Sequence, residues 1–162
     1  MMGTIRRILL SALAAMLVSA SCSVKDEPVR ELILVGSRLP EGLGLPSGDV
    51  SFIAFFNPSC PDCMAELPII AELYGTHGTG ISFLLVGRDM TAEQTARFLA
   101  DSGLDMPSAG DPERKVFNAF ASSGIPRCYL CREGTVIRIW KDTDFLSEKS
   151  FADALNIKHP EP

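Results

Sequence analysis

Two short and almost wholly apolar runs constrain the fold of this chain most strongly. The first is VSFIAFF, residues 50–56, and the second is ISFLLVG, residues 81–87. Apolar runs of this length without polar alternation are typical of strands that are covered on both faces of a sheet. The segment between them, from about Cys60 to Tyr74, is expected to be a helix that Gly75 closes. A strand, a helix and a second strand in this order predict an α/β chain.

Three more helices are expected further along the chain. Residues 91–94 have the spacing of a capping box, and the helix that they open should end at Gly103. Asp111 is followed by a proline at what would be the first helical position, so a helix should run from there to Ser123. Residues 147–157 have the pattern of a last amphipathic helix.

The remaining strands complete a sheet of mixed direction. Residues 31–36 are expected to form a short strand, and residues 37–49 a turn-rich loop. Residues 127–131 and 135–140 flank Arg132-Glu133-Gly134 and should form a hairpin. Strands that alternate with helices, followed by a hairpin and a helix, predict an α/β fold with a central mixed β-sheet flanked by helices.

The first residues have the pattern of an export signal. Arg6 and Arg7 precede the apolar run at residues 8–18, which is too short to span a bilayer comfortably. Small residues follow, and then Cys22, an arrangement that resembles the lipobox of bacterial lipoproteins. The resemblance implies acyl chains on Cys22 that anchor the protein to a membrane. The alternative is ordinary cleavage near Ala20, with Cys22 incidental.

These patterns divide the chain into a signal peptide at residues 1–21, a polar tether at 22–30 and one domain at 31–162. Removing the signal changes the formal charge from −5 to about −7. That charge, with no basic cluster, argues against nucleic acid as a partner. The expected location is the bacterial cell envelope, facing the periplasm rather than the cell surface. Asp26-Glu27 resembles a surface-export signal, but a solvated tether explains these charges equally well.

The stretch FFNPSCPDCMAELPII, residues 55–70, contains the most informative pair of side chains, Cys60 and Cys63. A cysteine at the first turn of a helix meets partial positive charge and unpaired N–H groups, which favour the thiolate over the thiol. Two intervening residues place the second cysteine nearly one turn further, on the same face. The pair can therefore close a small disulfide in which Cys60 is the exposed nucleophile and Cys63 the resolving thiol.

The pattern of a strand, CxxC and then Glu66-Leu67-Pro68 resembles the ResA/TlpA group of thioredoxin-like proteins, and so does GIPRCYLCREGTVI at 124–137. The resemblance covers about residues 30–157. It implies a thioredoxin-like fold and a membrane-tethered, extracytoplasmic thiol–disulfide oxidoreductase. It also implies that Pro126 is a cis-proline beside the CxxC pair, with Ile125 lining the contact to a partner's extended chain.

Two features depart from the family pattern. Ser59 stands where the group usually has tryptophan, and Ala54 stands where thioredoxins carry a buried acid in the preceding strand.

Glu66 lies three residues beyond Cys63, on the same helical face, and is either a proton shuttle for the cysteines or a solvated helix carboxylate. Arg127 could steer an acidic partner or support the thiolate; the alternative is an ordinary surface arginine.

Cys128 and Cys131 form a second CxxC, but they lie in a predicted strand. Residues three apart in a strand point to opposite faces roughly 10 Å apart, which is too far for a disulfide between them. Small buried side chains are the expected role, although Cys128 lies near Pro126. The two CxxC pairs are too far apart in the sequence for a usual zinc site, and His77 and His159 complete no metal site.

The expected function is reduction of disulfides in partner proteins, with no cofactor beyond the Cys60–Cys63 disulfide and no metal. Such a reaction needs an upstream electron donor. Two alternatives stay open. One is a redox-silent module that binds peptides in the groove beside Pro126. The other is a metal-binding protein that uses the cysteines.

Overall fold

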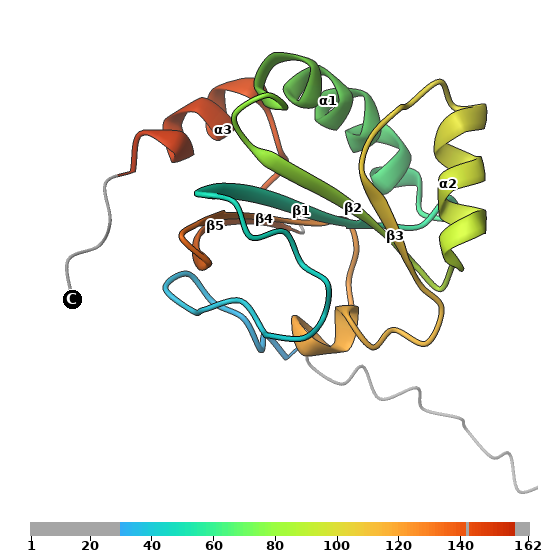
Figure 1. Ribbon diagram of the computed structural model, residues 1–162, viewed down its shortest axis with the longest axis horizontal. Helices are drawn as coiled ribbons and strands as arrows, with labels where there is room; N and C mark the ends of the chain where they lie inside the picture. Colours follow the sequence, from blue (N-terminus) through green and yellow to red (C-terminus); the bar gives the residue numbers. More distant parts are fainter. Residues whose placement is uncertain (1–29, 142, 158–162) are drawn as a thin grey trace, which may run out of the picture.

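A computed structural model describes residues 30–141 and 143–157. The predicted signal peptide, the tether up to residue 29 and the lipidation site Cys22 lie outside these residues. The described residues form a five-stranded sheet in the order β3-β2-β1-β4-β5 (Figure 1). Its strands are β1 (Val50–Phe56), β2 (Ser82–Arg88), β3 (Ser108–Asp111), β4 (Arg127–Arg132) and β5 (Thr135–Lys141). The first three are parallel, and β4 and β5 run antiparallel to their neighbours. The predicted mixed sheet is confirmed.

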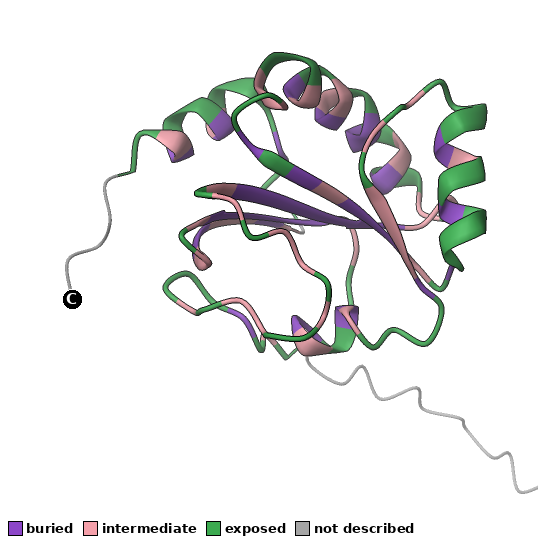
Figure 2. Ribbon diagram, in the orientation of Figure 1, coloured by how far each residue is buried: buried purple, intermediate pink, exposed green. Residues whose placement is uncertain are grey.

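Three helices pack on one face of this sheet (Figure 1). They are α1 (Pro61–His77), α2 (Ala92–Asp101) and α3 (Glu148–Leu155). The core under them is rich in aromatic rings, because Phe52 of β1 packs against Phe83, Trp140 and Phe151 with centroids 5.0, 6.3 and 5.6 Å away. The central strand β1 is buried along almost its whole length (Figure 2). A fixed β1 in turn fixes the start of α1, which follows it after four residues.

Irregular chain covers the opposite face of the sheet (Figure 1). Phe117 begins a short 3₁₀ helix, η1 (Phe117–Ala119), and Phe120 follows it. The centroids of their rings lie 5.4 and 5.0 Å from that of Phe55 in β1. The N-terminal segment lies beside them, with Ile33 buried in the same cluster. Both faces of β1 are therefore covered, as its apolar sequence predicted.

The strand predicted at residues 31–36 is wrong. The segment makes only an isolated bridge from Glu31 to Ala121, and the backbone N–H groups of residues 32 and 33 both donate to the carbonyl of Phe120. The strand was predicted from the apolar residues of the segment, but only Ile33 among them is buried. Leu32 and two other apolar side chains of the segment are more than half exposed. The loop predicted at 37–49 is confirmed.

The α-helix predicted from Asp111 to Ser123 is also wrong, since only the single turn η1 forms there. Asp111 does cap, but its carboxylate accepts the N–H groups of Val116 and Phe117, five and six residues on. Between them Arg114 has φ +56°, a left-handed conformation that ends any α-helix from Asp111. Asp111 was therefore correctly predicted to be a capping residue, but it caps η1 and not an α-helix that begins at residue 112.

One helix boundary and one further strand also differ from the predictions. Helix α1 continues through Gly75 and ends at His77, where the N–H of Gly78 donates to the carbonyl of Tyr74. Strand β3 was not predicted, because its four residues, SAGD, carry no large apolar side chain. The capping box of α2, the β4–β5 hairpin and the helix α3 are confirmed. Among the described residues, none of the helices has the length and apolar character needed to cross a bilayer.

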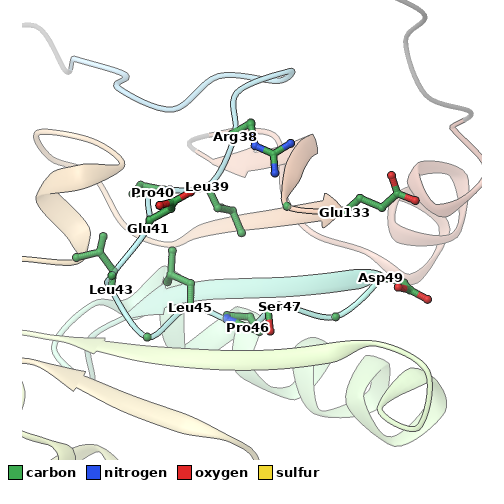
Figure 3. Close-up of a pocket in the computed structure, with 14 residues that line it drawn as sticks. Arg38, Leu39, Pro40, Glu41, Leu43, Leu45, Pro46, Ser47, Asp49 and Glu133 are labelled. Atoms are coloured by element: carbon green, nitrogen blue, oxygen red, sulfur yellow. The ribbon is translucent and has the colours of Figure 1, made fainter.

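A pocket of about 530 Å³ lies where the loop at 38–49 meets the β4–β5 turn (Figure 3). The N-terminal end of β1 is paired with Arg132 at the end of β4, so this pocket is at the edge of the sheet opposite to the start of α1. Its charged lining residues are Arg38, Glu41, Asp49 and Glu133, and its lining includes no cysteine. This pocket is therefore separate from the thiols.

Candidate active site

Cys60 is the N-cap residue of α1, at the edge of the sheet where β1 ends. Its backbone is extended, with φ −99° and ψ 111°, and Pro61 follows as the first helical residue. The Cys60 Sγ accepts the backbone N–H of Cys63 at 3.2 Å. The sulfur thus lies at the positive end of the helix dipole and next to a backbone donor. The predicted placement at a helix N-terminus is confirmed.

Cys63 lies one turn further into α1 and is 1% exposed. Burial, together with the neighbouring Cys60 sulfur, raises the pKa of the Cys63 thiol well above its usual range. Cys60 is only partly buried and lines an open pocket, so the two thiols differ in access. All four cysteines in the described part of the chain are free thiols. A reactant in solution therefore meets Cys60 first.

The loop before β4 lies against the same sulfur. The peptide bond between Ile125 and Pro126 is cis, which confirms that prediction. The carbonyl oxygen of Ile125 is 3.5 Å from the Cys60 Sγ, within reach of a thiol donor. Two segments that are 65 residues apart in sequence thus meet at one sulfur. Ile125 and Pro126 are partly exposed, so a chain that reaches Cys60 can also touch them.

Glu66 is buried, only 5% exposed, so the solvated carboxylate considered from the sequence is wrong. One carboxylate oxygen accepts the N–H of Leu146 at 3.2 Å, and the other lies 3.7 Å from the Cys128 Sγ. Burial raises the pKa of Glu66, although the Leu146 hydrogen bond opposes this effect. Its charge is close enough to raise the pKa of Cys63 as well. The carboxylate therefore acts electrostatically on two buried thiols, Cys63 and Cys128.

Arg127 corrects both sequence interpretations, because its side chain is 1% exposed and is not a surface arginine. Its guanidinium donates to both carboxylate oxygens of Glu31, at 2.8 and 3.0 Å, and to the carbonyl of Gly124 at 2.9 Å. Lys141 also contacts Glu31, at 2.7 Å. The side chain of Arg127 therefore fixes the N-terminal segment to β4 and is not available to bind a partner.

Cys128 and Cys131 lie on opposite faces of the sheet and are both buried, as the strand pattern predicted. Burial raises the pKa of the Cys128 thiol, and nearby Glu66 raises it further. Burial also raises the pKa of Cys131, to about 12. Both thiols are therefore protonated at neutral pH. Among the described residues, no three or more His, Cys, Asp or Glu side chains are grouped so that they could hold a metal ion.

Arg88 is a site residue that the sequence analysis missed. It ends β2, next to β1, and lines a pocket of about 520 Å³ together with Cys60. The signal that could have found it is its position: charged residues that follow a buried parallel strand gather at the edge where ligands bind. The pocket is lined by Asn57, Ser59, Cys60, Arg88, Asp89, Gly124 and Ile125.

Comparison with known proteins agrees with this geometry. No protein-family model matches the chain. It is 27% identical over 113 residues to the thiol-disulfide oxidoreductase ResA of Bacillus subtilis, and 25% identical over 112 residues to the ResA of Halalkalibacterium halodurans. These matches cover 67% and 68% of this chain and 61% and 62% of the relatives. The chain thus spans about three fifths of the length of the curated relatives that it matches.

Solved structures show the same fold at lower identity. A secreted disulfide oxidoreductase of Mycobacterium tuberculosis superposes with a TM-score of 0.59 at 18% identity. The superposition covers 76% of this chain and 95% of that protein. At this low identity the superposition establishes only that the fold is shared. The matches to the two ResA proteins are similarities of sequence. The chain is therefore similar in sequence to two ResA thiol-disulfide oxidoreductases and has a thioredoxin-like fold.

Proposed function

We propose that this chain is an extracytoplasmic thiol–disulfide oxidoreductase that reduces disulfides of partner proteins through Cys60 and Cys63. The observation that carries the proposal is the position of the Cys60 sulfur. It caps α1, accepts the Cys63 N–H and lies 3.5 Å from the carbonyl that precedes a cis-proline. The two ResA proteins that the chain resembles are named thiol-disulfide oxidoreductases, which supports the same chemistry.

The proposed reaction has two exchange steps. The Cys60 thiolate attacks one sulfur of the partner disulfide, forms a mixed disulfide and releases the other partner sulfur as a thiolate. Cys63 then loses its proton and attacks Cys60, which closes the Cys60–Cys63 disulfide and releases the partner as a dithiol. The partner gains two electrons, and the chain loses two. An upstream dithiol donor must restore the reduced pair before the next turnover.

The second step needs a base, because burial keeps the Cys63 thiol protonated. Glu66 is the residue proposed to take that proton, since it is a buried carboxylate whose charge acts on Cys63. Ile125 and Pro126 are proposed to contact the partner's extended chain through their backbone beside Cys60. Arg127 has no role in this proposal, because its guanidinium is bound to the carboxylate of Glu31.

The location is part of the proposal as well. Lipidation of Cys22 would anchor the protein in the bacterial envelope, with the domain facing the periplasm. Labelling the cells with a radioactive fatty acid tests this: the wild-type chain should carry the label, and the Cys22→Ser variant should not. An unlabelled wild-type chain would leave cleavage near Ala20 as the correct interpretation.

A redox titration of the purified chain tests the proposed chemistry. The protein is equilibrated with thiol–disulfide buffers of stepped potential, free thiols are alkylated, and mass mapping locates the label. The expected result is one reversible two-electron couple confined to Cys60 and Cys63, with Cys128 and Cys131 unchanged. Its midpoint separates a reductant from an oxidant of partner thiols.

The two alternatives predict different results in the same experiment. In a redox-silent peptide-binding module, alkylation of Cys60 would leave partner binding intact and the pair would show no reversible couple. In a metal-binding protein, the thiols would be blocked by an ion that elemental analysis finds in stoichiometric amount. Either result would refute the oxidoreductase proposal.

A further inference from the structure

The pocket beside Cys60 contains a positive charge that the exchange chemistry does not use. The pocket has a volume of about 520 Å³, within the range of ordinary ligand sites. Ser59 and Cys60 line it from the segment before α1, Gly124 and Ile125 from the loop before β4, and Arg88 and Asp89 from the end of β2. A partner segment bonded to the Cys60 sulfur would therefore lie beside Arg88.

The guanidinium of Arg88 is held in place but makes few polar contacts. It stacks over the Phe117 ring, with 4.9 Å from its central carbon to the ring centroid. Its side chain is 16% exposed, and in the described part of the chain its buried Nε has no hydrogen-bond partner. The backbone is fixed too, because the carbonyl of Arg88 accepts a hydrogen bond from Asn57 at 2.7 Å. The two terminal nitrogens of its guanidinium donate no hydrogen bond to another described residue, so their N–H groups are the donors left for a ligand.

The carboxylate of Asp89, which lies next to Arg88, is already bound to another cation. Arg114 donates to both oxygens of Asp89, at 2.5 and 2.9 Å. Asp89 approaches the Arg88 Nε only to 3.4 Å, beyond the usual hydrogen-bond range. Two guanidinium groups thus share one carboxylate. Burial and the neighbouring Arg114 lower the pKa of Arg88, while Asp89 and the two cysteines oppose this effect.

We propose that Arg88 determines substrate specificity by binding a carboxylate that lies beside the disulfide of a partner polypeptide. The inference rests on the proposed function, because it concerns the partner that reaches Cys60. The guanidinium binds the acidic side chain through parallel N–H···O bonds and takes no part in the electron transfer. The partner is thus a protein with an aspartate or glutamate next to its reducible cysteine. This is the role that the sequence suggested for Arg127, transferred to a residue that lines the site.

Matched peptides test the proposal. Two synthetic peptides each carry one cysteine joined by a disulfide to an aromatic thiol, and they differ only in having Asp or Asn beside that cysteine. The reduced chain attacks the peptide sulfur and releases the aromatic thiol, which is followed by absorbance. We expect the wild-type chain to react about tenfold faster with the Asp peptide, the effect of one charge-assisted hydrogen bond.

Three variants locate the source of the preference. Arg88→Gln should reduce the Asp-to-Asn rate ratio from about ten to about one, and Arg88→Lys should retain part of it because the charge remains without the planar fork. Arg97→Gln is the matched control, since it removes the same charge from a side chain that is 85% exposed on α2 and does not line the pocket. Its ratio should equal that of the wild type. The ratio compares two substrates of one protein, so partial unfolding of a variant does not change it.

Failure of the inference and failure of the proposed function give different results. Equal rates with both peptides in the wild-type chain, or a preference that persists in Arg88→Gln, overturn the inference and leave the exchange chemistry intact. A preference seen with small carboxylate-bearing disulfides but not with peptides also contradicts it, because the proposed partner is a polypeptide. If neither peptide is reduced, the proposed function itself fails.

Discussion

Replacing Glu66 by glutamine separates the two steps of the proposed exchange. The change removes a charge and a base but almost no volume. The amide oxygen can still accept the Leu146 N–H, now at 3.2 Å, while the contact to the Cys128 sulfur at 3.7 Å becomes poorer. Attack by Cys60 should keep its rate, because the Cys60 Sγ is held by the Cys63 N–H and the Ile125 carbonyl. Resolution by Cys63 should slow.

The expected size follows from the role of a positioned base. General-base catalysis contributes about 100-fold or more, and 100-fold corresponds to about 2.7 kcal/mol in the barrier. The structural loss is smaller, since one weak sulfur hydrogen bond contributes about 1 kcal/mol or less. A 100-fold decrease in the resolving step therefore exceeds what a small rearrangement around Glu66 would cause.

The variant should not be less stable at neutral pH. Burial raises the pKa of Glu66 above its usual 4.5 in the folded state. The stability that the protonated carboxyl contributes is complete below pH 4.5 and is lost as the pH rises through the folded-state pKa. The free energy of unfolding of Glu66→Gln should therefore rise relative to the wild type over that range. Urea denaturation at two pH values measures this difference.

Rapid mixing of the reduced chain with a protein disulfide, followed by acid quench and mass spectrometry, measures both steps. In Glu66→Gln the mixed disulfide on Cys60 should accumulate, whereas in the wild type it should be short-lived. Glu72→Gln is the control, since Glu72 is exposed on the same helix and should leave both steps unchanged. If Glu66→Gln resolves the mixed disulfide at the wild-type rate, Glu66 is not the base and its burial has another cause.

Three further predictions concern the stability of the fold and the reactivity of its thiols. Glu31→Gln should lower the free energy of unfolding by about 3 kcal/mol, because Arg127 would stay buried without its carboxylate. Burial alone would raise the pKa of Glu31, but hydrogen bonds from its two cationic neighbours hold it below 4.5. The difference should therefore be complete above pH 4.5 and vanish as the pH falls through the lower folded-state pKa, as acid and urea titrations will show. Gly110→Ala should destabilise by about 1–3 kcal/mol in urea denaturation, because the new Cβ would lie 2.3 Å from the backbone at the start of α2. Gly75→Ala, a helical site with open space, should instead stabilise by about 0.5–1 kcal/mol. The two cysteines of β4 should resist alkylation in the native chain and react in denaturant, and rapid native labelling would contradict their burial.

The parts of the fold that the sequence predicted are those where a local pattern has one structural solution. The apolar run at 50–56 and the turn between 127–131 and 135–140 each specify a strand or hairpin without reference to the rest of the chain. The four residues of β3 carry no such pattern. They form a strand because β2 offers a free edge and because Gly110 allows α2 to approach closely. Information of that kind lies in the neighbours and not in the segment.

In the candidate site, too, the sequence identified the residues that a local pattern marks and missed the contacts between distant segments. Cys60 and Cys63 could be identified from their spacing and from their position, because the helix that they begin comes shortly after a recognisable strand. The errors at Arg127 and in the segment 31–36 have one common cause. Arg127 was expected to be free and the segment to be a strand, whereas Glu31 of that segment is the partner of Arg127 across 96 residues. No sequence pattern pairs two residues at that separation.

The surroundings of Glu66 give a structural context for Ala54, one of the departures from the family pattern. The sequence has Ala54 where thioredoxins carry a buried acid in the strand. Ala54 is paired with Cys128 of β4, and the Cys128 sulfur lies 3.7 Å from the carboxylate of Glu66. Two small side chains thus stand side by side on the sheet under α1, and the carboxylate of Glu66 lies against one of them, Cys128. A larger residue at position 54 would compete for that space, so Ala54→Leu should displace Glu66 and slow the resolving step as Glu66→Gln does. Helix α1 thus places a buried carboxylate against the Cys128 sulfur, at the position of β4 that is paired with Ala54.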